Sequence, residues 1–395
     1  MNKTVLTTAL LASSFAGAAH AQSSVTLYGL IDAGISYANH SGTATTAGQK
    51  LFKYDDSVAQ SSRWGLRGTE DLGGGLKAVF TLENGFSSAN GTAAQGGALF
   101  GRQAWVGLSK DNVGAVTFGR QYSASVDYLG GLFSNGANTV AGNYAYHIND
   151  LDQLTSSRIN NSVKFASANF YGLTFGALYG FSNQAGAFGG APTVTGGATG
   201  SSRTYSFGAS YANGPIGLGA AYTDIRFPGL STPGFPVALA NFNTSSQLTS
   251  APTTIRDLRT FGVGGRYTVG PATLWALYTN THLEPISAAS STFTAYDAGA
   301  KYAFTQALSL AAGYSYMHLS GAGNGHWNQI NTALDYALSK RTDVYALAIY
   351  QEASGKIGSG ANLQAQIGDS TSFFNTSGTT SQNQLAFRIA MRHKF

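Results

Sequence analysis

Apolar and polar residues alternate along most of the chain with a period of two. Near the N-terminus, Val25, Leu27, Ile31, Ala33 and Ile35 share one face, and Thr26, Tyr28, Asp32 and Ser36 share the other. At the C-terminus, Leu385, Phe387, Ile389, Met391 and Phe395 oppose Gln384, Arg388, Arg392 and Lys394. In between, Tyr296, Ala298, Ala300, Tyr302 and Phe304 oppose Asp297 and Lys301. A period of two is that of side chains on a β-strand, so the pattern predicts strands with one apolar and one wet face.

The connections between these segments alternate between short and long. Short turns, most of them with Gly, Asn or Pro, are expected at Asp71–Gly75, Asp111–Gly114, Asn169–Gly172, Asn213–Pro215, Val269–Pro271, Phe304–Gln306 and Ser339–Arg341. Longer polar or Gly-rich segments are expected near 38–60, 87–100, 123–157, 184–202, 227–256, 284–293, 320–328 and 353–382. Seven short and eight long connections join sixteen strands.

This arrangement predicts an all-β fold, a 16-stranded antiparallel transmembrane β-barrel with short periplasmic turns and long extracellular loops. Segments such as Leu76–Ser87 and Ala272–Leu283 are long enough to cross the hydrocarbon as tilted strands. A barrel of this size encloses an aqueous channel rather than a packed interior. A soluble β-sandwich also alternates, but its inner face carries large aliphatic side chains rather than so many Gly, Ala and Tyr.

Composition supports a membrane barrel over a soluble domain. Only 10% of residues are charged, 51 are Gly and 44 are Tyr or Phe. After the N-terminus, the sequence contains no run of 18 uninterrupted apolar residues, which argues against transmembrane helices. The chain contains no cysteine, which is compatible with the cell envelope.

The first 21 residues have the pattern of a cleaved signal peptide. Lys3 supplies the positive charge, residues 5–16 form a short apolar run, and Ala19-His20-Ala21 is a cleavage pattern. The predicted domains are therefore a signal peptide at 1–21 and a barrel at 22–395. Without Lys3 the chain has 22 basic and 18 acidic residues, a net charge of +4. The basic residues are dispersed, so no nucleic-acid partner is predicted.

Six segments carry a resemblance to a known family. They are Ser23–Gly29, Ser62–Leu76, Gly101–Leu108, Phe118–Tyr122, Tyr336–Asp343 and the terminal Arg392-His-Lys-Phe395. In this order they resemble the Gram-negative general porins, most of all the trimeric porins of beta-proteobacteria, over essentially the whole mature chain. The resemblance implies passive diffusion of small hydrophilic solutes and ions, a homotrimer, and a third loop folded into the lumen. It also implies outer-membrane lipid, lipopolysaccharide and the assembly machinery as partners.

The predicted constricting loop is 123–157, rich in Asn, Gly, Ala and Tyr. The resemblance implies that Arg63 and Arg102 face it, with Arg158 following it. Alternation places Arg67 on the face of Arg63, and Lys164 on the face of Arg158. The full predicted constriction set is Arg63, Arg67, Arg102, Arg158, Asp127, Lys77, Glu83 and Lys164. Arg120 is left outside this set, because the resemblance suggests a role near the subunit contact.

The inward loop departs from enterobacterial relatives, whose loop tip reads Pro-Glu-Phe-Gly-Gly-Asp. The corresponding residues 133–142 carry no acid, which leaves Asp127, Asp150 and Asp152 as the acids of the loop. Asp150 and Asp152 are either solvated surface acids or part of the pore lining. Because the basic residues outnumber the acids, the constriction is expected to prefer anions moderately.

Other functions find little support in the sequence. The histidines of the mature chain have no ligand spacing and no Gly-x-Ser-x-Gly elbow is present, so neither an enzyme nor a metal site nor a cofactor is predicted. A substrate-specific channel and a plugged structural or adhesive barrel are the alternatives. Phe395 is expected to complete the C-terminal assembly signal, and the outward Gly29, Ala33 and Ile35 to pack against a neighbouring subunit.

Overall fold

The computed structural model describes residues 24–41, 48–181, 203–226, 255–285, 289–356, 360–370, 373–374 and 381–395. The expected signal peptide, the whole segment at 184–202 and most of that at 227–256 lie outside them. Among the described residues, no helix combines the length and apolarity needed to cross a bilayer.

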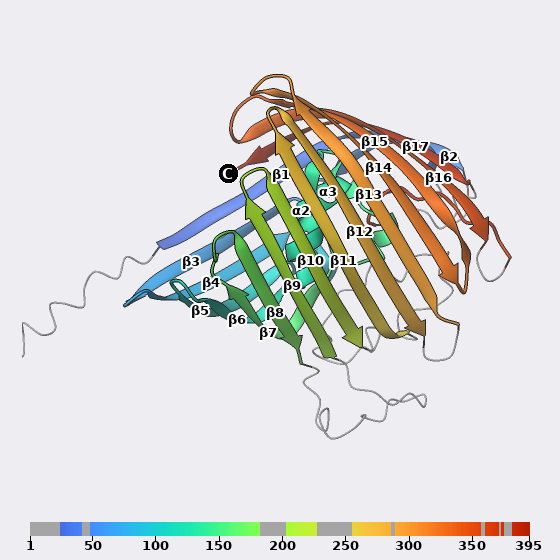
Figure 1. Ribbon diagram of the computed structural model, residues 1–395. Helices are drawn as coiled ribbons and strands as arrows, with labels where there is room; N and C mark the ends of the chain where they lie inside the picture. Colours follow the sequence, from blue (N-terminus) through green and yellow to red (C-terminus); the bar gives the residue numbers. More distant parts are fainter. Residues whose placement is uncertain are drawn as a thin grey trace, which may run out of the picture.

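One antiparallel sheet closes on itself to form a barrel (Figure 1). Its first eight segments are β1 (Ser24–Ser41), β2 (Gln49–Asp56), β3 (Arg63–Gly73), β4 (Leu76–Gly85), β5 (Gln103–Lys110), β6 (Gly114–Tyr122), β7 (Arg158–Ser167) and β8 (Leu173–Gly180). The next five are β9 (Arg203–Asn213), β10 (Ile216–Arg226), β11 (Ile255–Val269), β12 (Ala272–Pro285) and β13 (Ser291–Ala303). The last four are β14 (Leu308–Gly321), β15 (Asn324–Ala337), β16 (Thr342–Lys356) and β17 (Asn383–Lys394).

The seventeen segments occupy sixteen barrel positions, as predicted. One edge of β1 pairs with β17, from Leu30↔Lys394 to Ala38↔Ala386, and this pairing closes the barrel. The other edge pairs with β2 over 33–41 and with β3 over 24–30. The segments β2 and β3 are therefore two pieces of one strand, interrupted at 57–62.

All seven predicted short turns join strands where expected, but two predicted long connections are wrong. The segment 38–60 contains the end of β1 and all of β2, and 320–328 is reduced to the two residues between β14 and β15. Polar side chains at these strand ends indicate contact with water. They do not stop the backbone from pairing, as Leu319↔Gly325 shows.

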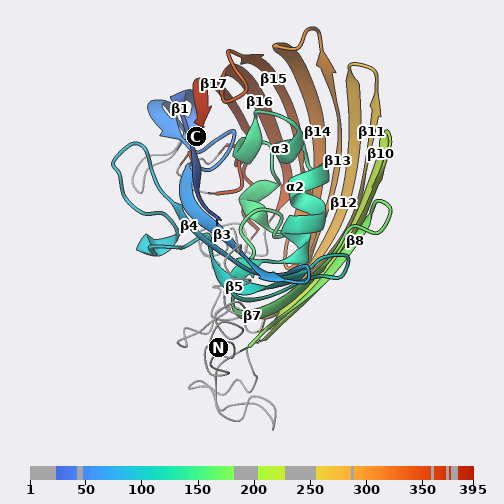
Figure 2. The ribbon, with the colours of Figure 1, turned by 90° about the vertical axis from the view of Figure 1, so that its left-hand side faces the viewer.

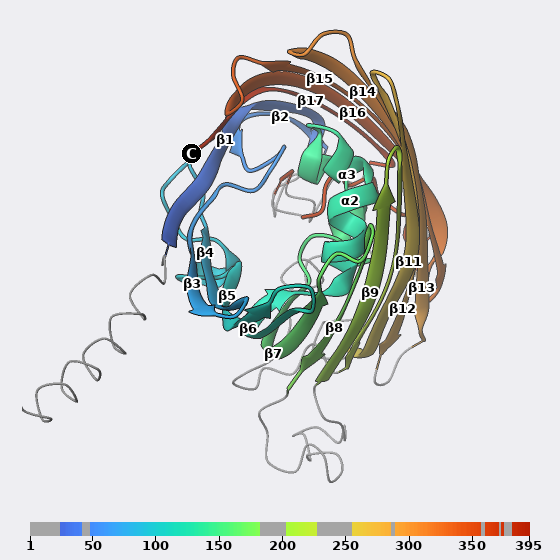
Figure 3. The same cartoon turned by 60° about the vertical axis from the view of Figure 1, so that its left-hand side comes forward.

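The alternation predicted for the strands is confirmed. On β17, Phe387, Ile389 and Met391 are exposed on the outer surface, while Gln384 and Arg388 are buried inside. The interior is polar and holds the segment 123–157, which Figures 2 and 3 show as short helical turns inside the barrel. The turns are η3 (Val126–Gly130), α2 (Gly131–Phe133), α3 (Asn135–Asn138), η4 (Gly142–Tyr144) and η5 (Ile148–Asp150), with a further turn η2 (Gln95–Gly97) between β4 and β5.

Candidate functional site: the channel constriction

The inward loop, residues 123–157, leaves the wall at the end of β6 and returns at the start of β7. Its two ends meet where the Ser123 amide donates to the Ser157 carbonyl oxygen, at 3.0 Å. In Figure 3 its helical turns lie along the inner side of β9–β14, and β1–β5 form the other side of the barrel. Residues 123–157 therefore connect β6 to β7 and lie inside the barrel.

Glycines in the barrel wall make room for the first turns of the inward loop. Tyr128, Leu129 and Phe133 are buried and lie against inward positions of β9–β11 that carry no side chain. At Gly264 on β11, a Cβ atom would lie 2.6 Å from the Cβ of Phe133. The loop can therefore pack against the barrel wall only at these glycine positions. The glycines thus determine where the loop lies in the lumen.

Polar side chains fasten the middle of the loop to the same wall. The backbone N–H of Asn135 donates to the Asp297 carboxylate on β13 at 2.8 Å, and Trp275 Nε1 donates to the side-chain oxygen of Asn135 at 2.8 Å. His147 lies between two carboxylates, with Nδ1 2.6 Å from Asp152 and Nε2 3.0 Å from Asp297. All of these groups are buried, so the contacts are shielded from water.

The charge on His147 follows from this position. Burial disfavours the imidazolium, but the carboxylates of Asp152 and Asp297 outweigh it and hold the pKa of His147 well above its ordinary value. A protonated ring donates to both carboxylates at once. His147 is thus a cationic clamp between the loop and β13.

Asp150 and Asp152 hold the loop together. Asp150 accepts hydrogen bonds from the backbone amides of residues 154–156, and Asp152 accepts one from Thr279 on β12. Both residues are fully buried. Neither carboxylate is exposed to the channel or to solvent. The two acids are therefore neither solvated surface acids nor part of the pore lining, the two alternatives that the sequence left open.

The segment between β16 and β17 packs onto the inward loop. Asp369 accepts a hydrogen bond from the Thr155 hydroxyl at 2.9 Å, and the side chains of Asn149 and Gln366 are hydrogen-bonded. Burial, and then the charge of Asp150, raise the pKa of Asp369 to about 8. Burial and Asp152 raise the pKa of Asp150 to about 6. The contact between these two segments therefore holds two carboxyls whose pKa values are raised above the ordinary one.

Arginines gather on the side of the barrel formed by β3–β7. Arg102 Nε lies 2.7 Å and Arg63 Nε 3.7 Å from the carboxylate of Glu83 on β4. The hydroxyl of Tyr28 donates to the same carboxylate at 3.0 Å. Arg102 is buried, yet its Nη1 has no hydrogen-bond partner among the described residues. Glu83 thus positions two guanidinium groups without using all of their donors.

Two further arginines extend this cluster. Arg158 is buried, with its guanidinium 5.1 Å from the centre of the Tyr122 ring. Arg120 Nη1 donates to the Asn160 side chain and lies 3.5 Å from the Arg158 carbonyl oxygen. We call Arg63, Arg102, Arg120 and Arg158, with Glu83, the arginine cluster.

The sequence did not place Arg120 in this cluster. Strict alternation puts it on the face of the outward Phe118, but the pairing of β6 with β7 shifts register between Gly119 and Gln121. Gly119 has φ +138°, a backbone conformation that side chains rarely adopt. The extra residue is on β7, where Asn160 and Asn161 lie opposite Arg120 alone, and the Asn160 side chain accepts a hydrogen bond from Arg120. Sequence reasoning left Arg120 out because the resemblance suggested a role near the subunit contact.

The remaining predicted residues lie apart from the cluster. Arg67 is exposed, with its guanidinium 5.3 Å from the Tyr28 ring. Lys164 is ion-paired with Asp127, at the base of the inward loop. Lys77 lies at the short-turn end, 2.8 Å from the Asp111 carboxylate, six residues along β4 from Glu83. At about 3.3 Å per residue this is too far for contact, so the structure does not bring Lys77 to the constriction.

Comparison with known proteins identifies the chain. A family model described as Gram-negative porin matches residues 7–356. The chain belongs to the Gram-negative porin family. An outer membrane porin protein of Bordetella pertussis is 33% identical over 399 residues, covering 89% of this porin and 94% of the relative. Outer membrane porin protein 32 of Delftia acidovorans is 38% identical over 194 residues, 47% of this porin and 51% of that protein.

Solved structures share the fold of this porin. The anion-selective porin from Comamonas acidovorans matches with a TM-score of 0.71 at 23% identity, covering 95% of this chain and all of that one. An outer membrane protein of Vibrio cholerae in its trimer form matches with a TM-score of 0.61 at 16% identity, covering 94% and 99% of the two chains. The family and the barrel place this porin in the outer membrane of a Gram-negative cell.

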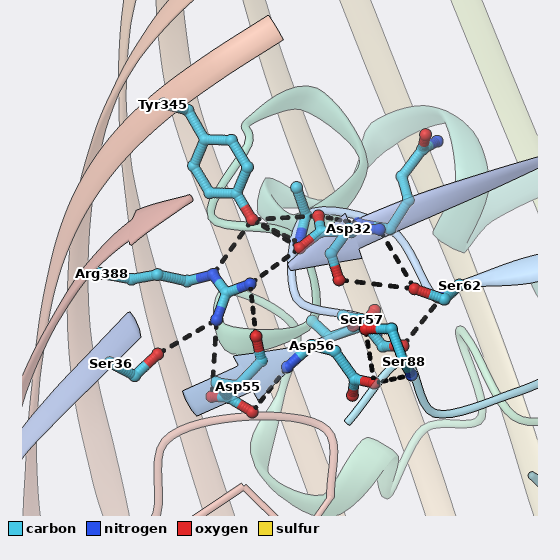
Figure 4. A network of polar contacts seen from close by, with 12 residues as sticks. Asp32, Ser36, Asp55, Asp56, Ser57, Ser62, Ser88, Tyr345 and Arg388 are labelled. Carbon is cyan, nitrogen blue, oxygen red and sulfur yellow. Dashed lines mark hydrogen bonds and ion pairs between the residues drawn. The ribbon is translucent and has the colours of Figure 1, made fainter. Parts of the chain in front are cut away.

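A buried ion-pair network joins β1, β2, β16 and β17 of the porin barrel (Figure 4), and a tyrosine of the inward loop extends it. Arg388 on β17 lies 2.8 Å from Asp32 on β1 and 3.7 Å from Asp55 on β2. Tyr345 on β16 donates to Asp32 at 2.8 Å, and Tyr144 of the inward loop donates to Asp55. Sequence reasoning placed Asp32 and Arg388 on polar faces but did not pair them, because only barrel closure makes β1 and β17 neighbours.

Proposed function

We propose that this porin forms a water-filled channel for passive diffusion of small hydrophilic solutes and ions, with a moderate preference for anions. The arginine cluster carries the proposal. Two of its guanidinium groups, those of Arg63 and Arg102, share the carboxylate of Glu83. The guanidinium of Arg158 lies over the Tyr122 ring, and that of Arg120 contacts the Arg158 carbonyl oxygen. Two unit charges about 8 Å apart interact by roughly 2 kcal/mol at an effective dielectric constant near 20, so a small positive excess biases permeation severalfold. The fold relative from Comamonas acidovorans is itself named anion-selective.

A substrate-specific channel and a plugged structural barrel are the competing functions. Swelling of liposomes by sugars of graded size separates a pore from a plugged barrel, because a plugged barrel admits no sugar. Saturable block of the conductance by one class of solute would indicate a substrate-specific channel. An enzymatic role is not part of the proposal, and the described residues contain no group of three or more His, Cys, Asp or Glu placed to hold a metal ion.

The assembled form in this proposal is a homotrimer with the first strands and the last at the contact. Gly29, Ala33 and Ile35 lie on the outer side of β1, where a partner subunit rather than lipid would cover them. The chain would be exported by a signal peptide at 1–21 and inserted by the outer-membrane assembly machinery, among lipid and lipopolysaccharide.

The selectivity is tested by removing the two arginines that share Glu83. In a KCl gradient, the wild-type zero-current potential is expected to show anion preference that weakens near 1 M salt, where the Debye length is about 3 Å. Arg63→Ser with Arg102→Ser is expected to shift this potential toward cation preference. The matched control, Lys340→Ser with Arg341→Ser, removes two charges from an exposed short turn and should leave the potential unchanged. A wild-type channel that prefers cations at low salt would refute the proposed selectivity.

A further inference from the structure

Two histidines lie side by side on the outer surface of β14 and β15, near the turn that joins these strands. His318 on β14 is the register partner of His326 on β15. Their neighbours Met317 and Trp327 are buried inside the barrel, where Met317 accepts a hydrogen bond from the backbone N–H of Ile148. Because successive side chains of a strand point to opposite faces, His318 and His326 share the outer face. Both are partly exposed.

The histidine pair, as we call His318 and His326, lies at the edge of the lipid-facing surface. The ring centres of Tyr278 and Tyr296 are 5.1 Å apart and those of Tyr296 and Tyr316 6.4 Å. Such belts of aromatic rings mark the boundary between hydrocarbon and head groups. His318 is two residues closer to the turn than Tyr316, a rise of about 7 Å. The histidine pair is therefore outside the hydrocarbon, where ions in water reach it.

The two imidazoles are close enough to share one ligand. Residues directly opposite each other in an antiparallel pair have Cβ atoms about 4.5–5.5 Å apart. The imidazole of His326 stacks on the Tyr316 ring, with centres 5.6 Å apart, so it leans toward β14, the strand that carries His318. Neither imidazole has a hydrogen-bond or ion-pair partner among the described residues. The ring nitrogens of the histidine pair are thus available to a ligand from outside.

The charged groups beside the histidine pair cancel each other. Ser354 on β16 is the register partner of His326, and Glu352 and Lys356 lie two residues to either side of it on the same face. Hard ions such as Ca²⁺ and Mg²⁺ require several carboxylate or carbonyl oxygens, whereas imidazole nitrogen suits zinc, copper and nickel. The binding chemistry of this position is therefore that of the two imidazoles.

We infer that the histidine pair binds a divalent transition-metal ion of the zinc, copper or nickel class. A neutral imidazole is the commonest metal ligand of proteins, and one nitrogen of each ring would hold the ion while water completes its coordination. With two protein ligands instead of the four of a structural zinc site, the ion exchanges readily with the solvent. It links β14 to β15 on the outside of the barrel, so the inference does not depend on how the channel selects ions.

Calorimetric titration of the untagged mature porin in detergent with Zn²⁺, at about pH 8 where free imidazole is neutral, tests the inference. The wild type should bind Zn²⁺ saturably, Cu²⁺ more tightly and Ca²⁺ not at all. His318→Gln and His326→Gln, alone or together, should weaken Zn²⁺ binding at least about tenfold, since even groups that only support a metal ligand contribute that much. The matched control, His282→Gln, removes another histidine of the outer face, opposite Thr292, and should bind like the wild type.

Chemical footprinting of the wild type gives a measurement that does not depend on how the variants fold. Diethyl pyrocarbonate acylates free imidazole nitrogens, and mass spectrometry locates the modified residues. Zn²⁺ should protect both His318 and His326 and leave His282 as reactive as before. Equal reactivity of the histidine pair with and without Zn²⁺ overturns the inference. Equal affinity of the wild type and the double variant for Zn²⁺ overturns it too.

Discussion

Glu83 controls how much positive charge the arginine cluster presents to the channel. It lies within ion-pair distance of both Arg63 and Arg102, and it is buried together with Arg102, whereas Arg63 is partly exposed. Replacing it with Gln removes one negative charge where the field is focused, so Glu83→Gln should strengthen the anion preference in a KCl gradient. Loss of a buried partner costs about 3–5 kcal/mol, so the variant should also unfold more easily. Glu70→Gln, at an exposed position of β3, is the control and should change neither property.

The ion pairs of His147 make the stability of the packing of the inward loop against the barrel wall depend on pH. Its pKa is raised in the folded state, so its contribution is complete below the unfolded value of about 6.5 and is lost as pH rises through the raised value. Asp150 and Asp369 have pKa values of about 6 and about 8, above the ordinary 3.8, so protonation favours their buried positions and their contribution also falls as pH rises. Hydrogen exchange of the amides of residues 126–157, corrected for its intrinsic pH dependence, should therefore show less protection at pH 9 than at pH 6.

The variant His147→Gln separates the histidine from the two carboxyls. It should lower the protection already at pH 6 and leave only the decline due to the two carboxyls, which falls around pH 6 for Asp150 and around pH 8 for Asp369. Protection that increases from pH 6 to pH 9 in the wild type would contradict the clamp.

At the scale of elements, the inward loop depends on missing side chains in β9–β11. A valine at position 264 would place its Cβ 2.6 Å from the Cβ of Phe133, closer than real Cβ atoms approach. Gly264→Val should push α2 away from the wall and toward the lumen, at a cost of about 1–3 kcal/mol for overpacking, and lower the single-channel conductance.

The neighbouring glycine supplies the control for this prediction. A Cβ at Gly265 would have Leu218 Cδ2 as its nearest neighbour, at an ordinary 3.5 Å. Gly265→Val should therefore leave the conductance as it is. An equal loss of conductance in both variants would show that the contact between the loop and the wall at position 264 does not determine the width of the channel.

At the scale of the whole molecule, the last residue helps to close the barrel. The Phe395 amide donates to the Gly29 carbonyl oxygen at 3.0 Å, and the Gly29 amide donates back at 3.1 Å. The Phe395 ring lies over Gly29, where a side chain would collide with it. Deleting Phe395 removes both hydrogen bonds and the aromatic end of the terminal strand, so it should reduce the amount of heat-modifiable trimer in the outer membrane. Phe395→Tyr keeps the backbone and the ring and should assemble normally, whereas wild-type trimer levels in the deletion would refute the prediction.

The sequence by itself determined the properties that are local to a strand. Alternation along β1 and β17 identified their outer and inner faces, and the breaks in it located the seven short turns, five of which contain Gly, Asn or Pro. These inferences succeed because side-chain direction in a strand depends only on the parity of the position, and turn residues act through their own backbone preferences. Two strand ends, at 38–60 and 320–328, were misjudged because polarity reports hydration and not backbone pairing.

Only the tertiary structure decided which residues meet across the barrel. The pairing of Arg388 with Asp32 needs the closure of β17 on β1, and the clamp at His147 needs β13 beside a loop some 150 positions away in sequence. Asp150 and Asp152 look like any loop acids until the loop packs inside the barrel, and the contact of Arg120 with Asn160 depends on the register shift between β6 and β7. These contacts depend on which strands face one another and on where side chains are absent. A pattern of period two carries no information on either, because every strand of a barrel repeats the same alternation.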